Sequence, residues 1–380
     1  MSCKMASRPF NVVHLTSVHP RYDTRIFLKE CRSLAALADV NVSLVVADGN
    51  GEEVREGVSI YDVGKPVSRI SRIRKTGRAV LRQAVALEAD LYHFHDPELL
   101  LVGLKLKKLG KKVIFDAHED VAKQLLSKPY LSPLMRRLLS AGFWVYERWA
   151  CRYFDAVVTA TPAIRDMYQA KIPELHVVDI NNYPISDELF LDSIAWKMRR
   201  NEACYVGAIS RIRGIFEVVA AFGSIENCRL NLVGTFNDSR LETELRKLPG
   251  WRNVKLWGQL DREGVKTVLS GSKMGIVTFL PSPNHMDAQP NKMFEYMSAG
   301  IPVIASNYPL WKDIIEGNDC GICVDPTDFN AIGSAVTFLL EHPERARNMG
   351  ANGRMAVEGR YNWTIEKQKL TALYYELLKP

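Results

Sequence analysis

Residues 290–305 read PNKMFEYMSAGIPVIA, in which a loop rich in Pro and Asn leads into a short helix and then into an apolar strand. We expect this strand at Ile301–Ala305, and its continuous apolar character is typical of a parallel strand covered on both faces. Helices that alternate with such strands build doubly wound α/β domains. The stretch therefore predicts an α/β domain in this half of the chain.

The same alternation extends over the whole chain. The candidate strands before residue 184 are 11–16, 41–47, 90–95, 112–117, 156–160 and 175–180. The candidate strands after residue 202 are 203–208, 229–233, 253–257, 273–279, 301–305 and 321–324. The sequence therefore predicts two doubly wound, Rossmann-like α/β domains that face each other across a cleft, with ligands at the carboxyl ends of the strands.

The domain boundaries follow from the break between the two series. Residues 1–185 form the first predicted domain, and the polar and basic residues 186–202 are interpreted as the linker. The second domain then spans 203–360. The tail 361–380 is expected to form a helix that could pack on either domain, including back on the first.

Composition narrows the class of protein. The formal charge of +7 comes from an excess of Lys and Arg in the first 200 residues, which favours anionic partners or is simply a solvated basic face. The seven Cys do not form a disulfide framework, and the lone CxxC at Cys320–Cys323 lacks further metal ligands. No apolar run is long enough for a signal peptide or a membrane span. We expect a cytoplasmic protein whose membrane contact, if any, is peripheral at the inner face of the cell membrane.

The turn after the first strand excludes two nucleotide-binding classes. Residues 17–25 contain no glycine, so the GxGxxG motif of dinucleotide-binding domains is missing, and the chain has no GxxxxGK[ST] phosphate loop. The turn is polar, aromatic and basic instead. Asp23 and Arg25 are therefore candidates for binding a sugar or acceptor, while Asp23 or Thr24 could also cap the next helix.

Two clusters of His and acidic residues follow neighbouring strands. The strings are HFHDPE at 93–98 and DAHED at 116–120, and both are predicted at the carboxyl edge of the first sheet. From them we take His95, Asp96, His118 and Glu119 as candidate sugar or acceptor ligands. His118, flanked by acids, is the best candidate for direct contact with substrate, whereas His95 and Asp96 could form a local turn network. A metal site from these four side chains is conceivable, but nothing demands one and no metal ligand is predicted.

In the second half, residues 207–214 (GAISRIRG) follow a strand and open a helix. A helix start offers free N–H groups and the positive end of the dipole, and Arg211 and Arg213 add forked donors, so this turn suits a diphosphate.

The opening stretch completes this picture. Lys292 lies in the first turn of its helix, where a cation opposes the dipole unless an anion binds there. Asn291, directly before it, is a further candidate for binding the donor, and Glu295, one turn on, can accept two hydroxyls as a ribose presents them. Compensation of the helix dipole is the alternative role of Glu295.

Residues 294–306, FEYMSAGIPVIAS, are similar to the Glu-Ala-Met-Ala-x-Gly-x-Pro-Val-Ile signature of the retaining GT-B glycosyltransferases of family 4, also called glycosyl transferases group 1. The turn 19–25 and the string 95–98 resemble a bacterial surface-polysaccharide branch of that family. The resemblance covers nearly the whole chain and implies a GT-B fold.

The resemblance also implies roles for individual residues. It implies that Glu295 holds the nucleotide ribose, that Arg211 and Arg213, or partly Lys292, hold the donor diphosphate, and that His118 is the active-site His. The family's other Glu, eight positions before the ribose Glu, corresponds to Asp287, which is one methylene shorter and is taken as a catalytic candidate that contacts the donor sugar, alongside His118 and Arg211.

The predicted activity is retaining, metal-independent transfer of a hexose from a UDP-sugar or GDP-sugar, without a cofactor. The acceptor is expected to be a hydroxyl of a saccharide or lipid-linked saccharide in the synthesis of cell-surface polysaccharide or lipopolysaccharide. One alternative is a nucleotide-sugar epimerase or hydrolase on the same fold, and another is a non-enzymatic, two-lobed sugar-binding protein. A nucleic-acid partner is not predicted, because the basic stretch 65–112 lacks exposed aromatic residues.

The stretch 131–153 mixes Arg with Leu, Phe and Trp. It could lie on an anionic membrane or pack within the domain.

Overall fold

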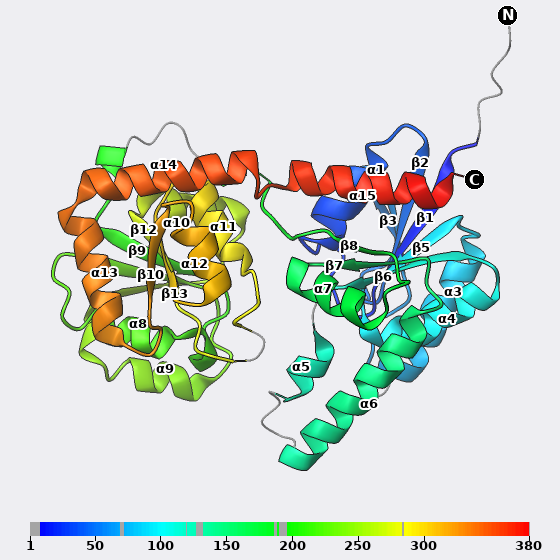
Figure 1. Ribbon diagram of the computed structural model, residues 1–380, viewed down its shortest axis with the longest axis horizontal. Coiled ribbons are helices and arrows are strands. Elements are labelled where there is room, and N and C mark those ends of the chain that lie inside the picture. The colour runs from blue at the N-terminus through cyan, green and yellow to red at the C-terminus, as the bar shows by residue number, and fades with distance from the viewer. Residues whose placement is uncertain are drawn as a thin grey trace, which may run out of the picture. The chain divides into compact units, whose positions relative to one another are not determined.

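We describe the protein from a computed structural model, which covers residues 8–68, 72–118, 120–126, 132–185, 188–189, 196–282 and 285–379. The chain divides into two compact units (Figure 1). Unit 1 consists of residues 1–182 and 366–380, and unit 2 consists of residues 183–365.

Unit 1 is built on an eight-stranded sheet with the order β3-β4-β2-β1-β5-β6-β7-β8. Its strands are β1 Phe10–Leu15, β2 Val40–Val46, β3 Glu53–Arg55, β4 Val58–Asp62, β5 Leu91–Phe94, β6 Lys112–Ala117, β7 Ala156–Thr159 and β8 Val177–Asp179. All neighbouring strands are parallel except β3, which pairs antiparallel with β4 at the sheet edge. The six predicted strands of this half are present, whereas β3 and β4 were not predicted.

The helices of unit 1 connect these strands. They are η1 Ile26–Cys31, α1 Arg32–Ala35, η2 Arg72–Thr76, α3 Gly77–Ala86, η3 Pro97–Leu99, α4 Leu100–Lys108, α5 Val121–Leu126, α6 Pro133–Cys151 and α7 Pro162–Lys171. The first of them, η1, is a π-helix, in which the Glu30 amide donates to the carbonyl of Arg25 five residues earlier. Such wide turns are rare and often occur at functional sites.

The last helix, α15 Trp363–Leu378, belongs to unit 1 from Glu366 onward. The Glu366 carboxylate accepts a hydrogen bond from the Asn181 amide at 2.7 Å. Tyr374, further along the same helix, is buried among the side chains of β1 and β5. The end of the chain therefore completes the unit with which the chain begins.

Unit 2 contains a six-stranded, all-parallel sheet with the order β11-β10-β9-β12-β13-β14. This is the 3-2-1-4-5-6 order of the Rossmann fold. The strands are β9 Glu202–Val206, β10 Arg229–Val233, β11 Val254–Gly258, β12 Met274–Val277, β13 Val303–Ser306 and β14 Gly321–Val324. All six lie where the sequence predicts strands.

The helices of unit 2 surround this sheet. They are η4 Trp196–Met198, η5 Arg211–Arg213, α8 Ile215–Ala221, α9 Ser239–Leu245, η6 Pro249–Asn253, α10 Arg262–Gly271, α11 Asn291–Ser298, α12 Pro309–Ile315, α13 Phe329–Glu341 and α14 Pro343–Gly359. None of the helices in the described part of the chain combines the length and the apolar character that crossing a membrane requires.

The segment interpreted as a linker packs into unit 2 where it is described. Leu189 is buried in the core of this unit. Arg199 is buried as well, and its guanidinium donates to the carbonyls of Leu269, Ser272 and Ala299 at 2.9–3.0 Å. These carbonyls lie at the C-terminal ends of α10 and α11, where a cation satisfies otherwise unpaired acceptors. Arg199 of this segment thus caps two helices of unit 2.

Candidate functional site

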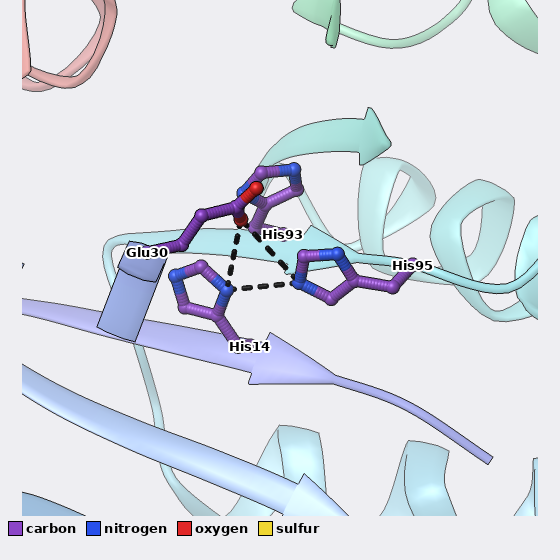
Figure 2. A group of neighbouring side chains, drawn as sticks. All are labelled: His14, Glu30, His93 and His95. Carbon is purple, nitrogen blue, oxygen red and sulfur yellow. Dashed lines mark hydrogen bonds and ion pairs between the residues drawn. The ribbon is translucent and has the colours of Figure 1, made fainter. Parts of the chain in front are cut away.

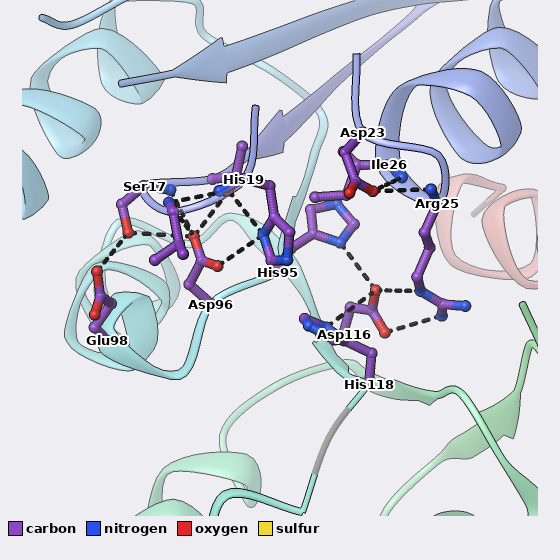
Figure 3. Close-up of polar contacts among 12 residues, drawn as sticks. Ser17, His19, Asp23, Arg25, Ile26, His95, Asp96, Glu98, Asp116 and His118 are labelled. Atoms are coloured by element: carbon purple, nitrogen blue, oxygen red, sulfur yellow. Dashed lines mark hydrogen bonds and ion pairs between the residues drawn. The ribbon is translucent and has the colours of Figure 1, made fainter. Parts of the chain in front are cut away.

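A pocket of about 450 Å³ lies in unit 1, beside the carboxyl ends of β5 and β6. Its walls come from the turn after β1, from the residues after β5 and β6, and from α5. The polar side chains that line it are His19, Arg72, His95, Asp96, Glu98, Asp116, His118 and Gln124. The predicted His95, Asp96 and His118 are therefore brought together, and Figure 3 shows their contacts.

Asp96 organises the turn that follows β1. One carboxylate oxygen accepts hydrogen bonds from the Thr16 hydroxyl at 2.9 Å and from the Ser17 amide, and the other lies 3.0 Å from His19 Nδ1. Burial opposes ionisation, but the bonds from His19, Ser17 and Thr16 outweigh it and lower the pKa of Asp96 to about 2. Asp96 therefore takes part in the local turn network while it also lines the pocket.

Asp116 is the centre of a second network. Arg25 donates to both of its carboxylate oxygens, with Nε to Oδ2 at 2.8 Å and Nη2 to Oδ1 at 3.0 Å. His95 Nδ1 lies 2.9 Å from Oδ2. Burial opposes the charge of Asp116, but the Arg25 guanidinium and the bond from His95 hold its pKa well below the usual range. Arg25 and His95 are both fully engaged in the interior next to the pocket.

His118 is the member of this group that is partly open to solvent, with a side-chain exposure of 21%. Its Nδ1 lies 3.8 Å from Asp116 Oδ2 and has no hydrogen-bond partner among the described residues. Its ring meets that of His19 edge-on at 5.2 Å. An imidazole whose Nδ1 faces a buried carboxylate while the side chain is partly exposed is suited to contact a sugar hydroxyl.

Two further candidates have different outcomes. One oxygen of Asp23 accepts hydrogen bonds from the amides of Arg25 and Ile26 at 2.8 and 2.9 Å, so Asp23 caps the first turn of η1. Glu119 lies outside the described residues.

In unit 2, the turn after β9 faces the start of α11. Gly207 has a φ of +125°, and a Cβ at this position would lie 2.8 Å from Lys292 Nζ. Lys292 is buried, its Nζ has no hydrogen-bond partner among the described residues, and it lies 3.7 Å from the centre of the Tyr205 ring. Burial first, and then the charge of Arg213, lower the pKa of Lys292 well below its usual value. The structure thus brings Lys292 and Arg213 together beside Gly207, as the prediction of a diphosphate site requires.

The two candidate arginines of this turn differ in their surroundings. The guanidinium of Arg213 lies 5.2 Å from the Phe279 ring and close to Lys292. Arg211 is 54% exposed, and its Nη1 lies 2.6 Å from the carboxylate of Glu244. The structure therefore groups Lys292 with Arg213, while Arg211 pairs on the surface.

Glu295 lies one turn after Lys292 on α11. Its Oε1 accepts from Arg262 Nη1 at 2.8 Å, and Arg262 also forms a two-bond pair with Glu188. The second oxygen of Glu295 has no bond from the described residues, so it can accept a ligand hydroxyl. Asn291 is exposed at the start of α11, and Asp287 is exposed in the preceding turn.

Several side chains of these sites were not among the predicted candidates, and Asp116, His19 and Arg262 are the ones that hold predicted residues in place. Asp116 could have been found from strand alternation, because it lies two residues before His118 and so points to the same face. His19 and Arg262 carry no such signal, since their partners Asp96 and Glu295 are remote in the sequence.

Two family profiles match the chain. The profile of Glycosyltransferase Family 4 matches residues 25–182, and that of Glycosyl transferases group 1 matches residues 187–356. Together they cover most of both units.

Relatives with assigned activities agree with these profiles. The chain is 25% identical over 287 residues to D-rhamnosyltransferase WbpZ of Pseudomonas aeruginosa, a match that covers 73% of this chain and 70% of the relative. It is 21% identical over 340 residues to MMP alpha-(1->4)-mannosyltransferase of Mycolicibacterium hassiacum, covering 85% and 78%. A match to the capsular polysaccharide biosynthesis glycosyltransferase CapM of Staphylococcus aureus, at 26% identity, spans 46% of each chain.

Solved structures share the fold. Sucrose-phosphate synthase from Thermosynechococcus elongatus has a TM-score of 0.79 at 19% identity, covering 97% of this chain and 99% of that chain. HepE from Anabaena, solved with UDP and glucose, has a TM-score of 0.73 at 14% identity, covering 97% and 100%. The predicted fold class and the resemblance to family 4 are thereby confirmed, whereas the retaining mechanism and the surface-polysaccharide branch stay predictions. The chain belongs to the GT-B glycosyltransferases of family 4.

Proposed function

We propose that the protein is a retaining hexosyltransferase that transfers a sugar from a UDP-sugar or GDP-sugar to a hydroxyl of a saccharide or lipid-linked saccharide. The observation that carries this proposal is the buried ammonium of Lys292, which lies beside Arg213 without a hydrogen-bond partner among the described residues. A buried, unpaired cation is costly, and a bound diphosphate offsets that cost.

The donor then occupies unit 2 through its nucleotide half. Lys292 and Arg213 hold the diphosphate and stabilise the negative charge that develops on it as the sugar leaves. The second oxygen of Glu295 accepts the ribose hydroxyls, with its carboxylate kept in place by Arg262. The positive charge of the two side chains supports a reaction without a metal ion at the diphosphate.

The acceptor or the transferred sugar occupies the pocket of unit 1. His118 contacts it, and Asp116 orients His118 from behind. The carboxylates in the pocket wall already have partners: Asp96 holds the turn, Asp116 holds Arg25, and Glu98 accepts from Ser17 and Arg72. Because retaining enzymes with a covalent intermediate need a carboxylate nucleophile, these engaged groups favour same-face attack by the acceptor hydroxyl.

We also propose a peripheral contact of α6 with an anionic membrane. The first turns of this helix expose Leu134, Leu138 and Leu139 to solvent, next to the exposed Arg137. An apolar face flanked by arginine matches a surface of acyl chains and anionic headgroups. Flotation with liposomes that contain or lack anionic lipid tests this contact, and equal recovery in the protein fraction with both would contradict it.

The donor is identified by a thermal-shift screen against UDP-, GDP- and ADP-sugars, with Lys292→Met as the matched control. A donor at 100 times its dissociation constant adds roughly 2.7 kcal/mol of stability to the wild type. We expect one nucleotide class to raise the melting temperature of the wild type and to leave that of Lys292→Met almost unchanged.

The reaction is then followed by analysis of products with and without an acceptor saccharide. A new glycosidic product of retained anomeric configuration supports the proposal. Free sugar or an epimer as the sole product would instead show a hydrolase or an epimerase.

A further inference from the structure

Four potential metal ligands meet in the interior of unit 1 (Figure 2). His14 lies on β1, His93 and His95 lie on or directly after β5, and Glu30 lies on η1. All four side chains have 0% exposure. His14 and His93 are lateral partners in the parallel sheet, and His95 is two residues further along the same strand direction, so the three rings share one face.

The π-helix brings Glu30 over this face. Its Oε2 lies 3.9 Å from His14 Nδ1, 3.8 Å from His93 Nδ1 and 3.9 Å from His95 Nε2. His14 Nδ1 and His95 Nε2 are themselves 2.9 Å apart, and all four ligand atoms lie within 4.8 Å of one another. Ligand atoms around a tetrahedral zinc ion are about 3.4 Å apart, given bonds of 2.0–2.1 Å. To surround one cation, His14 Nδ1 and His95 Nε2 must move slightly apart, and His93 Nδ1 must exchange its contact with the Tyr374 hydroxyl, 2.8 Å away, for the ion.

The remaining ring nitrogens have the partners that metal-bound histidines require. His95 Nδ1 lies 2.9 Å from the carboxylate of Asp116, and His14 Nε2 lies 3.1 Å from the Tyr374 hydroxyl. A ligating His commonly donates its other N–H to a carboxylate or another acceptor, which fixes the ring and strengthens the ligand. Two of the three histidines are held in this way.

Glu30 needs a counter-ion. Neither of its carboxylate oxygens has a hydrogen-bond partner among the described residues, although Arg25 Nε approaches Oε1 at 3.2 Å. That arginine already donates two hydrogen bonds to Asp116. A fully buried carboxylate surrounded by three imidazoles is an expensive arrangement unless a cation is shared among them.

We propose that His14, Glu30, His93 and His95 form a structural binding site for one divalent transition-metal ion, with Zn²⁺ as the fitting probe. Imidazole and carboxylate ligands suit zinc and its neighbours in the first transition row. The ion replaces the hydrogen bond between His14 Nδ1 and His95 Nε2, and the single N–H of the neutral His14 ring then lies on Nε2, where the Tyr374 hydroxyl accepts it. This site is separate from the donor diphosphate and holds no reacting group.

The role of such an ion follows from its place in the fold. It ties η1 to β1 and β5, and through Tyr374 it also supports α15. Because the site is closed to solvent, the ion is acquired as unit 1 folds, and its binding free energy adds to the stability of the folded state.

The test is the metal content of the full chain, purified with a tag free of histidine after expression in zinc-supplemented medium. Mass spectrometry of the element should find about one zinc per chain in the wild type. Glu30→Gln and His93→Gln should each lower this content severalfold, whereas His176→Gln, which changes a histidine outside the cluster, should leave it unchanged. Refolding of the wild type with Co²⁺ should give the visible absorption of a cobalt ion in a low-symmetry site.

The wild-type measurement decides the question even if both cluster variants fail to fold. A wild type that carries no metal above background, both after expression with zinc and after refolding with Zn²⁺, would overturn the proposal. Full metal content in a folded Glu30→Gln or His93→Gln variant would also overturn it, because the ion would then lie elsewhere.

Discussion

Replacement of Lys292 by Met should lower the activity of the protein without lowering its stability. The methionine keeps the length and apolar stem of the side chain but removes its charge. In the unliganded protein the Nζ group is buried without a hydrogen-bond partner among the described residues, which costs about 1–3 kcal/mol. The cation–π contact with Tyr205, at 3.7 Å, returns about 2 kcal/mol, so the two effects nearly cancel. The melting temperature of Lys292→Met should therefore equal or exceed that of the wild type.

Activity should fall in the same variant. Loss of a preorganised contact to developing charge typically costs about 2.7–4 kcal/mol, or a 10²–10³-fold drop in kcat. The assay is sugar transfer at saturating acceptor, and Lys312→Met, which changes an exposed lysine of unit 2, is the control. A melting temperature several degrees below that of the wild type, or a kcat within threefold of it, would refute the reasoning.

The pH dependence gives a second readout. Because the pKa of Lys292 is lowered from 10.5 in the folded protein, the unfolded chain binds more protons between the two pKa values. Wild-type stability should therefore rise with pH through this interval, up to about 10.5. Lys292→Met should lack this pH dependence. The free energies of unfolding of the two proteins, measured by denaturant unfolding, should therefore approach each other as the pH rises through the alkaline range.

The remaining predictions concern single side chains. Arg213→Ala should reduce kcat by about 10²-fold, whereas Arg211→Ala should reduce it less, because Arg211 is paired with Glu244; equal losses in a transfer assay would place both on the diphosphate. His118→Ala should lower kcat without lowering the melting temperature, and a cooperative unfolding transition shifted far downward would show a structural role instead. Asp96→Asn should destabilise the protein by roughly 2 kcal/mol at neutral pH, since the folded pKa of about 2 lies below the ordinary 3.8. The difference in free energy of unfolding between the wild type and Asp96→Asn should be full above pH 3.8 and vanish as the pH falls through about 2. Urea unfolding of both proteins at neutral and at low pH measures this difference.

The sheets could be predicted almost completely from the sequence, because buried parallel strands are continuous apolar runs such as Val113–Phe115. The missed strands β3 and β4 form a short hairpin at the sheet edge. Because two of the three residues of β3, Glu53 and Arg55, are charged, the sequence pattern there is typical of a loop. Edge strands carry charge for good reason, since it prevents pairing with other chains. The pattern of apolar residues therefore predicts the central strands of a sheet better than its edge strands.

The candidate sites could be predicted in their location but not in their internal pairing. The end of a strand located His118 after β6, and the start of a helix located Lys292 in the first turn of α11. The sequence did not indicate that Arg211 turns to Glu244, because that contact depends on the path of the η5 turn. It also gave no sign that Glu30 meets His14, because the π-helical turn shifts the side-chain spacing away from the regular α-helical period.

The placement of residues 366–379 with unit 1 has a consequence for synthesis on the ribosome. Residues 183–365 emerge as one continuous segment, so unit 2 has all of its strands and helices before α15 is translated. Unit 1 is begun first but receives Glu366 and Tyr374 last. During synthesis of unit 2, the surface of unit 1 that α15 later covers is therefore exposed to solvent. Co-translational folding normally proceeds from the N-terminus, and in this chain the order of completion is reversed.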